Sequence, residues 1–227
     1  SFGLQTAYSN HDQKAYYGIR NYDVFHESFY SNLLYNSILN NTNNKFKSGL
    51  NFSLDKYVEN IDNEDFSRTD KNLGAFFEWS HDDIDNLSWT AGMRIDFNNN
   101  IGTFITPRLH FRYAYNSSTI IRLSSGTGRK AANIFAENQS IFGSNRRIYI
   151  DKGNNPFYGL LPEKAWNFGT SISKSFNLFN KSANLVFDYY ITQFNNQVIV
   201  DLEEEGRVSF YNLNGNSSAK SFQLSFD

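Results

Sequence analysis

The sequence predicts an all-β protein, a sector of an antiparallel transmembrane β-barrel with roughly ten strands, short periplasmic turns and long extracellular loops. Three observations support this prediction. The composition favours strands, long segments alternate between apolar and polar residues, and the connections between these segments alternate between short and long.

The composition favours β-structure and excludes several functional classes. Aromatic residues make up 17% of the chain and Pro occurs only 3 times, a mixture typical of strands. The mean hydropathy is -0.55, and no apolar run approaches the roughly 20 residues that a membrane-spanning helix needs. A barrel strand can be this polar, because half of its side chains face a polar lumen.

Charge and reactive residues exclude other classes. A net charge of -2 gives no basic field for nucleic acid. The chain has no Cys, which excludes disulfides and thiolate chemistry. The four His residues show no spacing typical of metal ligands. We therefore expect a protein that is not an enzyme and has no catalytic residue, metal site or cofactor.

Period-two alternation is the dominant pattern. It is strongest in residues 45–55, 87–98, 105–115 and 183–192. In 87–98, for example, Trp89 and Met93 share one parity while Arg94 and Asp96 share the other. Successive strand side chains point to opposite faces, so each segment has an apolar and a polar side. Weaker patterns cover 28–40, 71–81, 119–126, 163–176 and 221–227.

The two faces carry different expectations. The apolar face should contact lipid, with these residues on it: Phe46, Leu50, Phe52, Leu73, Phe77, Trp89, Met93, Leu109, Phe111, Leu185 and Phe187. The polar face carries charges of both signs, at Lys47, Asp55, Glu78, Arg94, Asp96, Arg108, Arg112, Arg122 and Asp188. These charges fit a solvated lumen wall with mixed ion pairs, or alternatively a ligand path or a surface that holds a plug.

Strand lengths and connections favour a membrane barrel over a soluble sandwich. The segments exceed the usual 5–6 residues of soluble strands and match the roughly 9–11 of tilted membrane strands. Short connections are expected at 41–44, 82–86, 116–118 and 178–182, and long ones at 58–70, 127–161 and 201–207. Aromatic residues should form an inner girdle at Trp79, Trp89, Tyr113 and Tyr115. Pro107 falls within a strand, which predicts a bulge or a local loss of pairing.

Both ends of the sequence read as strands. Residues 2–8 already alternate, and residues 221–227 still alternate at the last position. No charged and apolar leader precedes the first strand. We therefore expect a fragment that lacks both termini of a longer protein.

Four blocks in the second half resemble TonB-dependent outer-membrane receptors, especially those of the Bacteroidetes. The segment Arg122–Asn138 resembles a strand and loop of that family, and Leu161–Gly169 resembles its L-x-P-E-x-A-x-N-x-G strand opening. Phe187–Val200 and Phe210–Leu213 follow in the same order, and Thr106–Leu109 upstream is also similar. The resemblance is specific over 105–227 and general over 1–104.

The resemblance implies that residues 1–227 belong to one receptor β-barrel domain in the bacterial outer membrane, without the plug domain. The implied function is TonB-dependent uptake of a scarce nutrient such as a ferric siderophore, cobalamin or an oligosaccharide. The implied partners are outer-membrane lipid, the plug and remaining barrel, TonB, the extracellular ligand, and a surface lipoprotein or other envelope proteins. The alternative is a passive or structural barrel subunit of a larger outer-membrane complex.

Loop 127–161 is the expected site of ligand recognition. Its length is typical of functional loops, and its apolar residues, with a helical turn expected at 133–137, predict an ordered element. Basic residues beside aromatic ones suit an anionic or aromatic ligand. The candidate ligand-binding residues are Arg129, Arg146, Arg147 and Tyr149.

Overall fold

A computed structural model describes residues 1–227 apart from 63, 84–85, 152, 154 and 156. One antiparallel sheet contains the long strands, which pair in chain order. These strands are β1 (Phe2–Tyr17), β2 (Arg20–Leu39), β3 (Asn41–Ile61), β5 (Arg68–Asp82), β6 (Leu87–Asn98), β7 (Gly102–Asn116), β8 (Thr119–Lys130), β10 (Glu163–Leu178), β11 (Lys181–Asn195) and β14 (Asn216–Phe226). The short strand β4 (Glu64–Asp65) adds to β3 outside this path.

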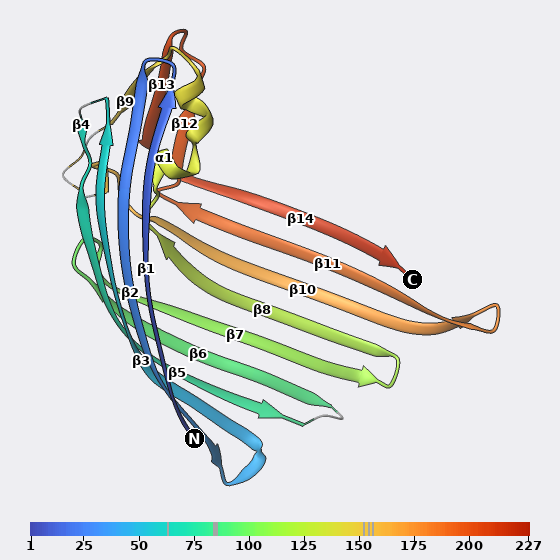
Figure 1. Ribbon diagram of the computed structural model, residues 1–227. Coiled ribbons are helices and arrows are strands. Elements are labelled where there is room, and N and C mark those ends of the chain that lie inside the picture. The colour runs from blue at the N-terminus through green and yellow to red at the C-terminus, as the bar shows by residue number, and fades with distance from the viewer. Residues whose placement is uncertain (63, 84–85, 152, 154, 156) are drawn as a thin grey trace.

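The sheet is a single curved layer with two open edges (Figure 1). β1 forms one edge and β14 the other. The expected architecture of long antiparallel strands in one barrel sector is confirmed, and no second long-strand sheet packs against it in the described part of the chain. Among these residues no helix is long and apolar enough to cross a membrane.

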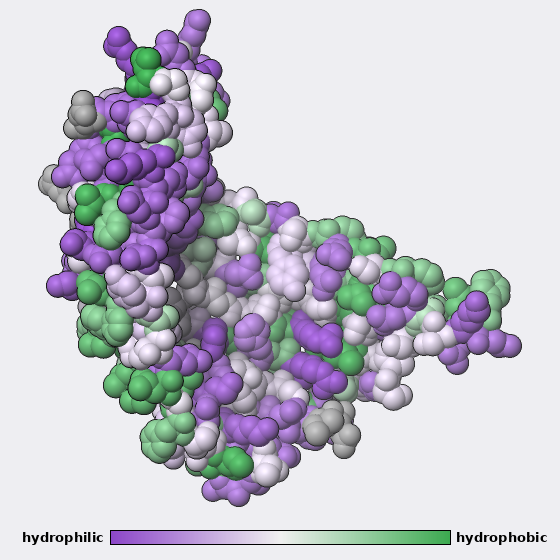
Figure 2. Space-filling view, in the orientation of Figure 1, coloured by the Kyte–Doolittle hydropathy of each residue, from purple (hydrophilic) through white to green (hydrophobic). Residues whose placement is uncertain are grey.

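Strand register confirms the predicted faces. Lys47 pairs with Glu78, Glu78 with Gly92, and Gly92 with Arg108, so these positions share one face. Large apolar side chains of the opposite parity are exposed, and Met93 keeps 59% of its surface. Figure 2 shows hydrophilic side chains gathered on the concave side of the sheet. The polar face is therefore the inner face, and the apolar face is the outer one that would contact lipid.

The turns follow from local backbone preferences. Phe179 and Asn180 both have positive φ, at 50° and 61°, as a two-residue hairpin turn requires. The turn expected at 41–44 is instead at Asn40, with a φ of 65°, because strand pairing resumes at once at Asn41. The turn expected at 82–86 lies between β5 and β6, and its residues 84–85 are outside the described ones.

The long connections are shorter than expected where the strands extend farther than the alternation indicated. The connection expected at 58–70 is reduced to the stretch between β3 and β5, because β3 continues to Ile61 and β5 begins at Arg68.

Pro107 pairs with Met93 of β6, whereas the ladder between β7 and β8 begins only at Arg108. The predicted loss of pairing at this proline is confirmed.

The two remaining long connections, between β8 and β10 and between β11 and β14, fold together into a small domain, which we call the cap. It contains α1 (Ile134–Glu137), the 3₁₀ turn η1 (Gln139–Gly143) and a sheet of β9 (Arg147–Ile150), β12 (Val198–Asp201) and β13 (Arg207–Asn212). The helical turn expected at 133–137 is confirmed as α1. β9 runs parallel to β13, which joins two loops far apart in sequence. The cap lies at one end of the strands, above the concave face (Figure 1).

Apolar side chains of the cap pack on the inner face of the strand ends. Phe135 and Phe210 are fully buried, and Tyr22 of β2 and Ile61 of β3 belong to the same core. Tyr22 stacks on Phe142, with ring centroids 5.1 Å apart. Burial of this size stabilises a loop by about 1.5–3 kcal/mol for each large apolar side chain. The described part of loop 127–161 is therefore ordered by its own apolar residues.

Candidate functional site

A buried ion pair joins the strand ends to the cap. Glu59 near the end of β3 and Arg68 at the start of β5 have side chains only 2% and 3% exposed. The Arg68 Nη1 donates to Glu59 Oε2 over 2.5 Å. Phe66 and Ser67 lie in the connection between these strands, where the Ser67 hydroxyl accepts the backbone N–H of Glu59. The short connection thus fixes both charges at one point.

Two tyrosines complete the shell around the Glu59 carboxylate. The Tyr22 hydroxyl donates to Oε1 over 3.0 Å, and the Tyr158 hydroxyl donates to Oε2 over 2.6 Å. Burial raises the pKa of the Tyr158 hydroxyl well above its ordinary value, and the nearby Glu59 charge acts in the same direction. Tyr158 therefore remains a protonated donor at neutral pH. Because it belongs to the cap, this bond ties the cap to β3.

The Arg68 guanidinium is held by the cap as well. It lies 4.1 Å from the ring centroid of Tyr57 and 4.7 Å from that of Tyr158. Its Nη2 donates to the side-chain oxygen of Asn133 over 2.5 Å, directly before α1. Its two terminal nitrogens therefore have acceptors, as a buried charge requires, whereas its buried Nε has no partner among the described residues. Asn133 and Tyr158 thus fix the position of the cap at two points.

A hollow of about 540 Å³ opens between the cap and the ends of β2 and β3. We call it the rim hollow. This volume is in the range of small-molecule binding sites. Its lining residues are Arg20, Ile61, Asp62, Glu64, Phe66, Phe135, Arg147, Ile148, Tyr149 and Ile150. The lining thus combines charged side chains of both signs with apolar ones.

Two of the four predicted ligand-binding residues meet at the rim hollow. Arg147 and Tyr149 line it from β9, and both are exposed. Among the described residues, the Arg147 guanidinium has no hydrogen bond or ion pair, and the residue lines the hollow. The Tyr149 ring has Arg207 at 4.0 Å from its centroid, and that cation fixes the ring orientation.

The other two predicted residues contact backbone carbonyls. Arg146 Nη1 donates to the carbonyl oxygens of Leu202, Glu204 and Arg207, at 2.7, 3.3 and 3.1 Å. It thereby holds the hairpin between β12 and β13. Arg129 lies 5.0 Å from the Phe104 ring centroid and donates to the Ile101 carbonyl. Neither residue lines the rim hollow.

Sequence reasoning missed Arg20 at this site. Its guanidinium donates to the Arg146 carbonyl and lies 3.8 Å from Asp62. Its Nη1 is buried and has no partner among the described residues. The only sequence signal was its place beside Gly18, a turn glycine with a φ of 68°, which marks a strand end at the rim.

The inner face of β3, β5, β6 and β7 carries a dense polar network. Glu78 is contacted by Arg108 and lies 3.9 Å from Lys47. Arg94 donates to both oxygens of Asp96 and to the Asn51 side chain. A side chain at Gly74 would collide with Arg94, Asp96 and Asn51. Every charge of this network has a partner, so it stiffens the wall.

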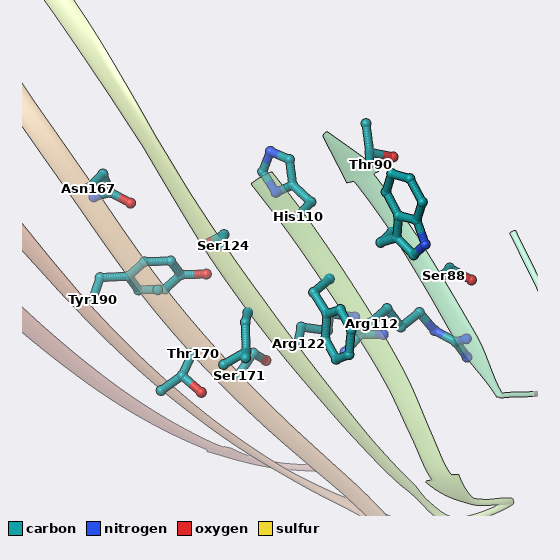
Figure 3. A pocket seen from close by; sticks show the side chains of 14 residues that line it. Ser88, Thr90, His110, Arg112, Arg122, Ser124, Asn167, Thr170, Ser171 and Tyr190 are labelled. Atoms are coloured by element: carbon teal, nitrogen blue, oxygen red, sulfur yellow. The ribbon is translucent and has the colours of Figure 1, made fainter. Parts of the chain in front are cut away.

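A second hollow, of about 550 Å³, lies on the inner face of β6, β7, β8, β10 and β11. We call it the inner-wall hollow. Figure 3 shows Arg112 and Arg122 together near its centre, with Ser88 on one side and Ser171 on the other. His110 and Tyr190 line it farther along the strands (Figure 3). Among the described residues no group of three or more His, Cys, Asp or Glu could hold a metal ion.

Comparison with known proteins identifies the fold. No family model matches the sequence, and no curated protein matches it. The siderophore receptor PirA from Pseudomonas aeruginosa is similar, with a TM-score of 0.66 and 12% identity over 98% of this chain. The hemophore receptor HasR from Serratia marcescens has a TM-score of 0.69 and 12% identity over 100% of this chain. The copper transporter OprC has a TM-score of 0.67 and 12% identity over 91% of this chain.

This chain covers less than half of each similar protein. It spans 44% of the PirA chain, 43% of the HasR chain and 35% of the OprC chain. These neighbours are TonB-dependent receptors. The structure therefore has the fold of one sector of such a receptor barrel.

Proposed function

We propose that this chain forms part of the barrel wall of a TonB-dependent receptor that takes up a scarce nutrient across the bacterial outer membrane. The observation that carries the proposal is the architecture of the wall. Its outer face is apolar, its inner face is polar, and an ordered cap with a ligand-sized hollow stands at its extracellular end. The fold likeness to siderophore, hemophore and copper transport proteins supports the same function.

The rim hollow is the proposed site where the cap contacts the ligand. Arg147 offers unpaired donors, and Tyr149 is 50% exposed although Arg207 lies over one face of its ring. Both residues are held on one short strand. Guanidinium groups bind carboxylate and phenolate oxygens, while ring faces bind flat or cationic groups. An anionic or aromatic ligand such as a ferric siderophore fits this chemistry. Arg146 would contribute by holding the hairpin between β12 and β13 of the cap, whereas Arg129 contacts Phe104 and Ile101 beside β7.

An uptake experiment tests the proposal. Cells that carry the full-length receptor would be supplied with ferric siderophore, cobalamin or oligosaccharide, with TonB present or deleted. We expect uptake of one ligand class that depends on TonB. Uptake of none of them, or passage of small solutes without TonB, would contradict the proposal and favour a passive or structural barrel.

A paired variant tests the rim hollow itself. The double variant Arg147→Ala/Tyr149→Ala should weaken ligand binding by roughly tenfold or more, because each 1.4 kcal/mol of lost contact is a factor of ten. A matched control is Leu202→Ala/Glu203→Ala, which also removes one charge and one large side chain, at the exposed hairpin tip of the cap. If both variants bind ligand equally well, recognition does not occur in the rim hollow.

A further inference from the structure

Two arginines face each other across neighbouring strands on the inner wall. Arg112 of β7 pairs directly with Arg122 of β8. Directly opposed side chains have Cβ atoms only about 4.5–5.5 Å apart, and like charges in that position destabilise a sheet. Arg112 is half-buried and Arg122 is exposed toward the lumen. The pair therefore costs stability unless something neutralises it.

No neutralising group is in contact within the described chain. Neither guanidinium has a hydrogen bond or an ion pair among the described residues, and their cross-strand neighbours Ser88 and Ser171 are uncharged. The nearest acids in the same row are Asp82 and Asp188, each two strands away from an arginine. The backbones of strands two apart in a sheet are about 10 Å from each other.

An acidic pair on the same face shows how this chain accommodates two opposed like charges. Asp55 of β3 pairs directly with Asp70 of β5. His26 lies 3.0 Å from Asp55, and the Asn98 side-chain amide donates to Asp70 over 2.7 Å. The opposed acids thus have partners supplied by this chain, whereas the opposed arginines have none.

We propose that Arg112 and Arg122 form an oxyanion site, and that its resident ligand is a carboxylate side chain from the part of the receptor that lies outside residues 1–227. The carboxylate would accept from both guanidinium groups at once, which removes their repulsion. A resident partner fits better than a passing solute, because repulsion between the arginines acts in every folded molecule. This inference rests on the proposed function, since more than half of each similar receptor lies outside the matched region.

Whether Tm falls or rises when either arginine is replaced tests the proposed site. In the purified full-length receptor, Arg112→Gln and Arg122→Gln should each lower Tm by about 2–4 °C. The double variant should add little to either single one, because both arginines hold the same carboxylate. If the arginines are unbridged, each substitution should instead raise Tm, because it removes repulsion. Lys47→Gln is the control, since it removes one exposed charge from the same inner face and lies outside the hollow that holds the two arginines.

Two further measurements identify the source of the anion. Inorganic phosphate should leave the Tm of the wild-type receptor unchanged, because a resident carboxylate already fills the site. A rise in Tm that Arg112→Gln abolishes would assign the site to a dissolved anion and overturn the resident carboxylate. Asp188→Asn should leave Tm near that of the wild type, and a loss equal to that of Arg122→Gln would make Asp188 the partner and overturn the proposal. These readouts do not depend on uptake, so they fail independently of the proposed function.

Discussion

The inner face of this wall has two regions that differ in whether their charged side chains have partners. Across β2 to β6, His26 contacts Asp55 and Arg94 contacts Asp96, and Arg108 of β7 completes this set of ion pairs at Glu78. Across β7 to β11, Arg112 and Arg122 have no partner among the described residues. Paired charges lock neighbouring strands together, whereas unpaired ones leave binding capacity for another group. The contrast separates the part of the wall that is scaffold from the part that is open for contact.

The most deeply buried ion pair, Glu59 with Arg68, lies beneath the cap. We expect the largest loss of stability when this pair is broken. Glu59→Ala leaves Arg68 buried without its counter-charge and removes the acceptor of two tyrosines. We expect a loss of about 3–5 kcal/mol, as for other buried pairs broken on one side. Hydrogen exchange of the β9 and β13 amides would measure the loosening of the cap.

A double variant separates the pair from its surroundings. Glu59→Leu/Arg68→Met removes both charges and keeps most of the volume, so it should cost less than Glu59→Ala alone. If the double variant is the more destabilised of the two, packing rather than charge compensation holds the cap in place.

A smaller loss of stability is expected at Gly74, the glycine that lies against the side chains of the polar network. Gly74→Ala places a methyl group against Arg94, Asp96 and Asn51, and overpacking of this kind costs about 1–3 kcal/mol. Gly128→Ala is the matched control in the open region, because a side chain there meets no atom within 4 Å. Equal Tm values for the two variants would show that the paired region is no tighter than the open one.

The strands and their faces were predictable, whereas the contacts at the rim were not. Alternation gave 87–98 with the same bounds as β6 and placed Arg94 and Asp96 on the inner face, because a strand has a fixed period of two. Alternation carries no information about parallel pairing between distant loops. The pairing of β9 with β13 could therefore not be predicted. The hydrogen bonds from Arg146 to three backbone carbonyl oxygens could not be predicted for the same reason. The prediction that Arg147 and Tyr149 bind ligand stays a prediction.

Buried charges were also hidden from sequence. Glu59 and Arg68 fall in a stretch that reads as a long polar loop, where charges are usually solvated. They are buried because β3 and β5 continue into the stretch that was predicted to be a loop, and the cap covers their ends.

The smallest expected effect lies at the solvent-exposed margin of the paired region. Lys47 is 3.9 Å from Glu78, and its side chain is 59% exposed, whereas Arg108 contacts the other oxygen of the same carboxylate. Exposed pairs contribute about 0–1 kcal/mol and weaken with salt. Lys47→Gln should therefore change the free energy of unfolding by less than about 1 kcal/mol, and added NaCl should erase the difference. Arg108→Gln, the matched comparison, should cost more, because Glu78 is 12% exposed and would lose its closest donor. If Lys47→Gln proved the more damaging, Glu78 would depend on the lysine, and the boundary between paired and open wall would lie one strand nearer β3.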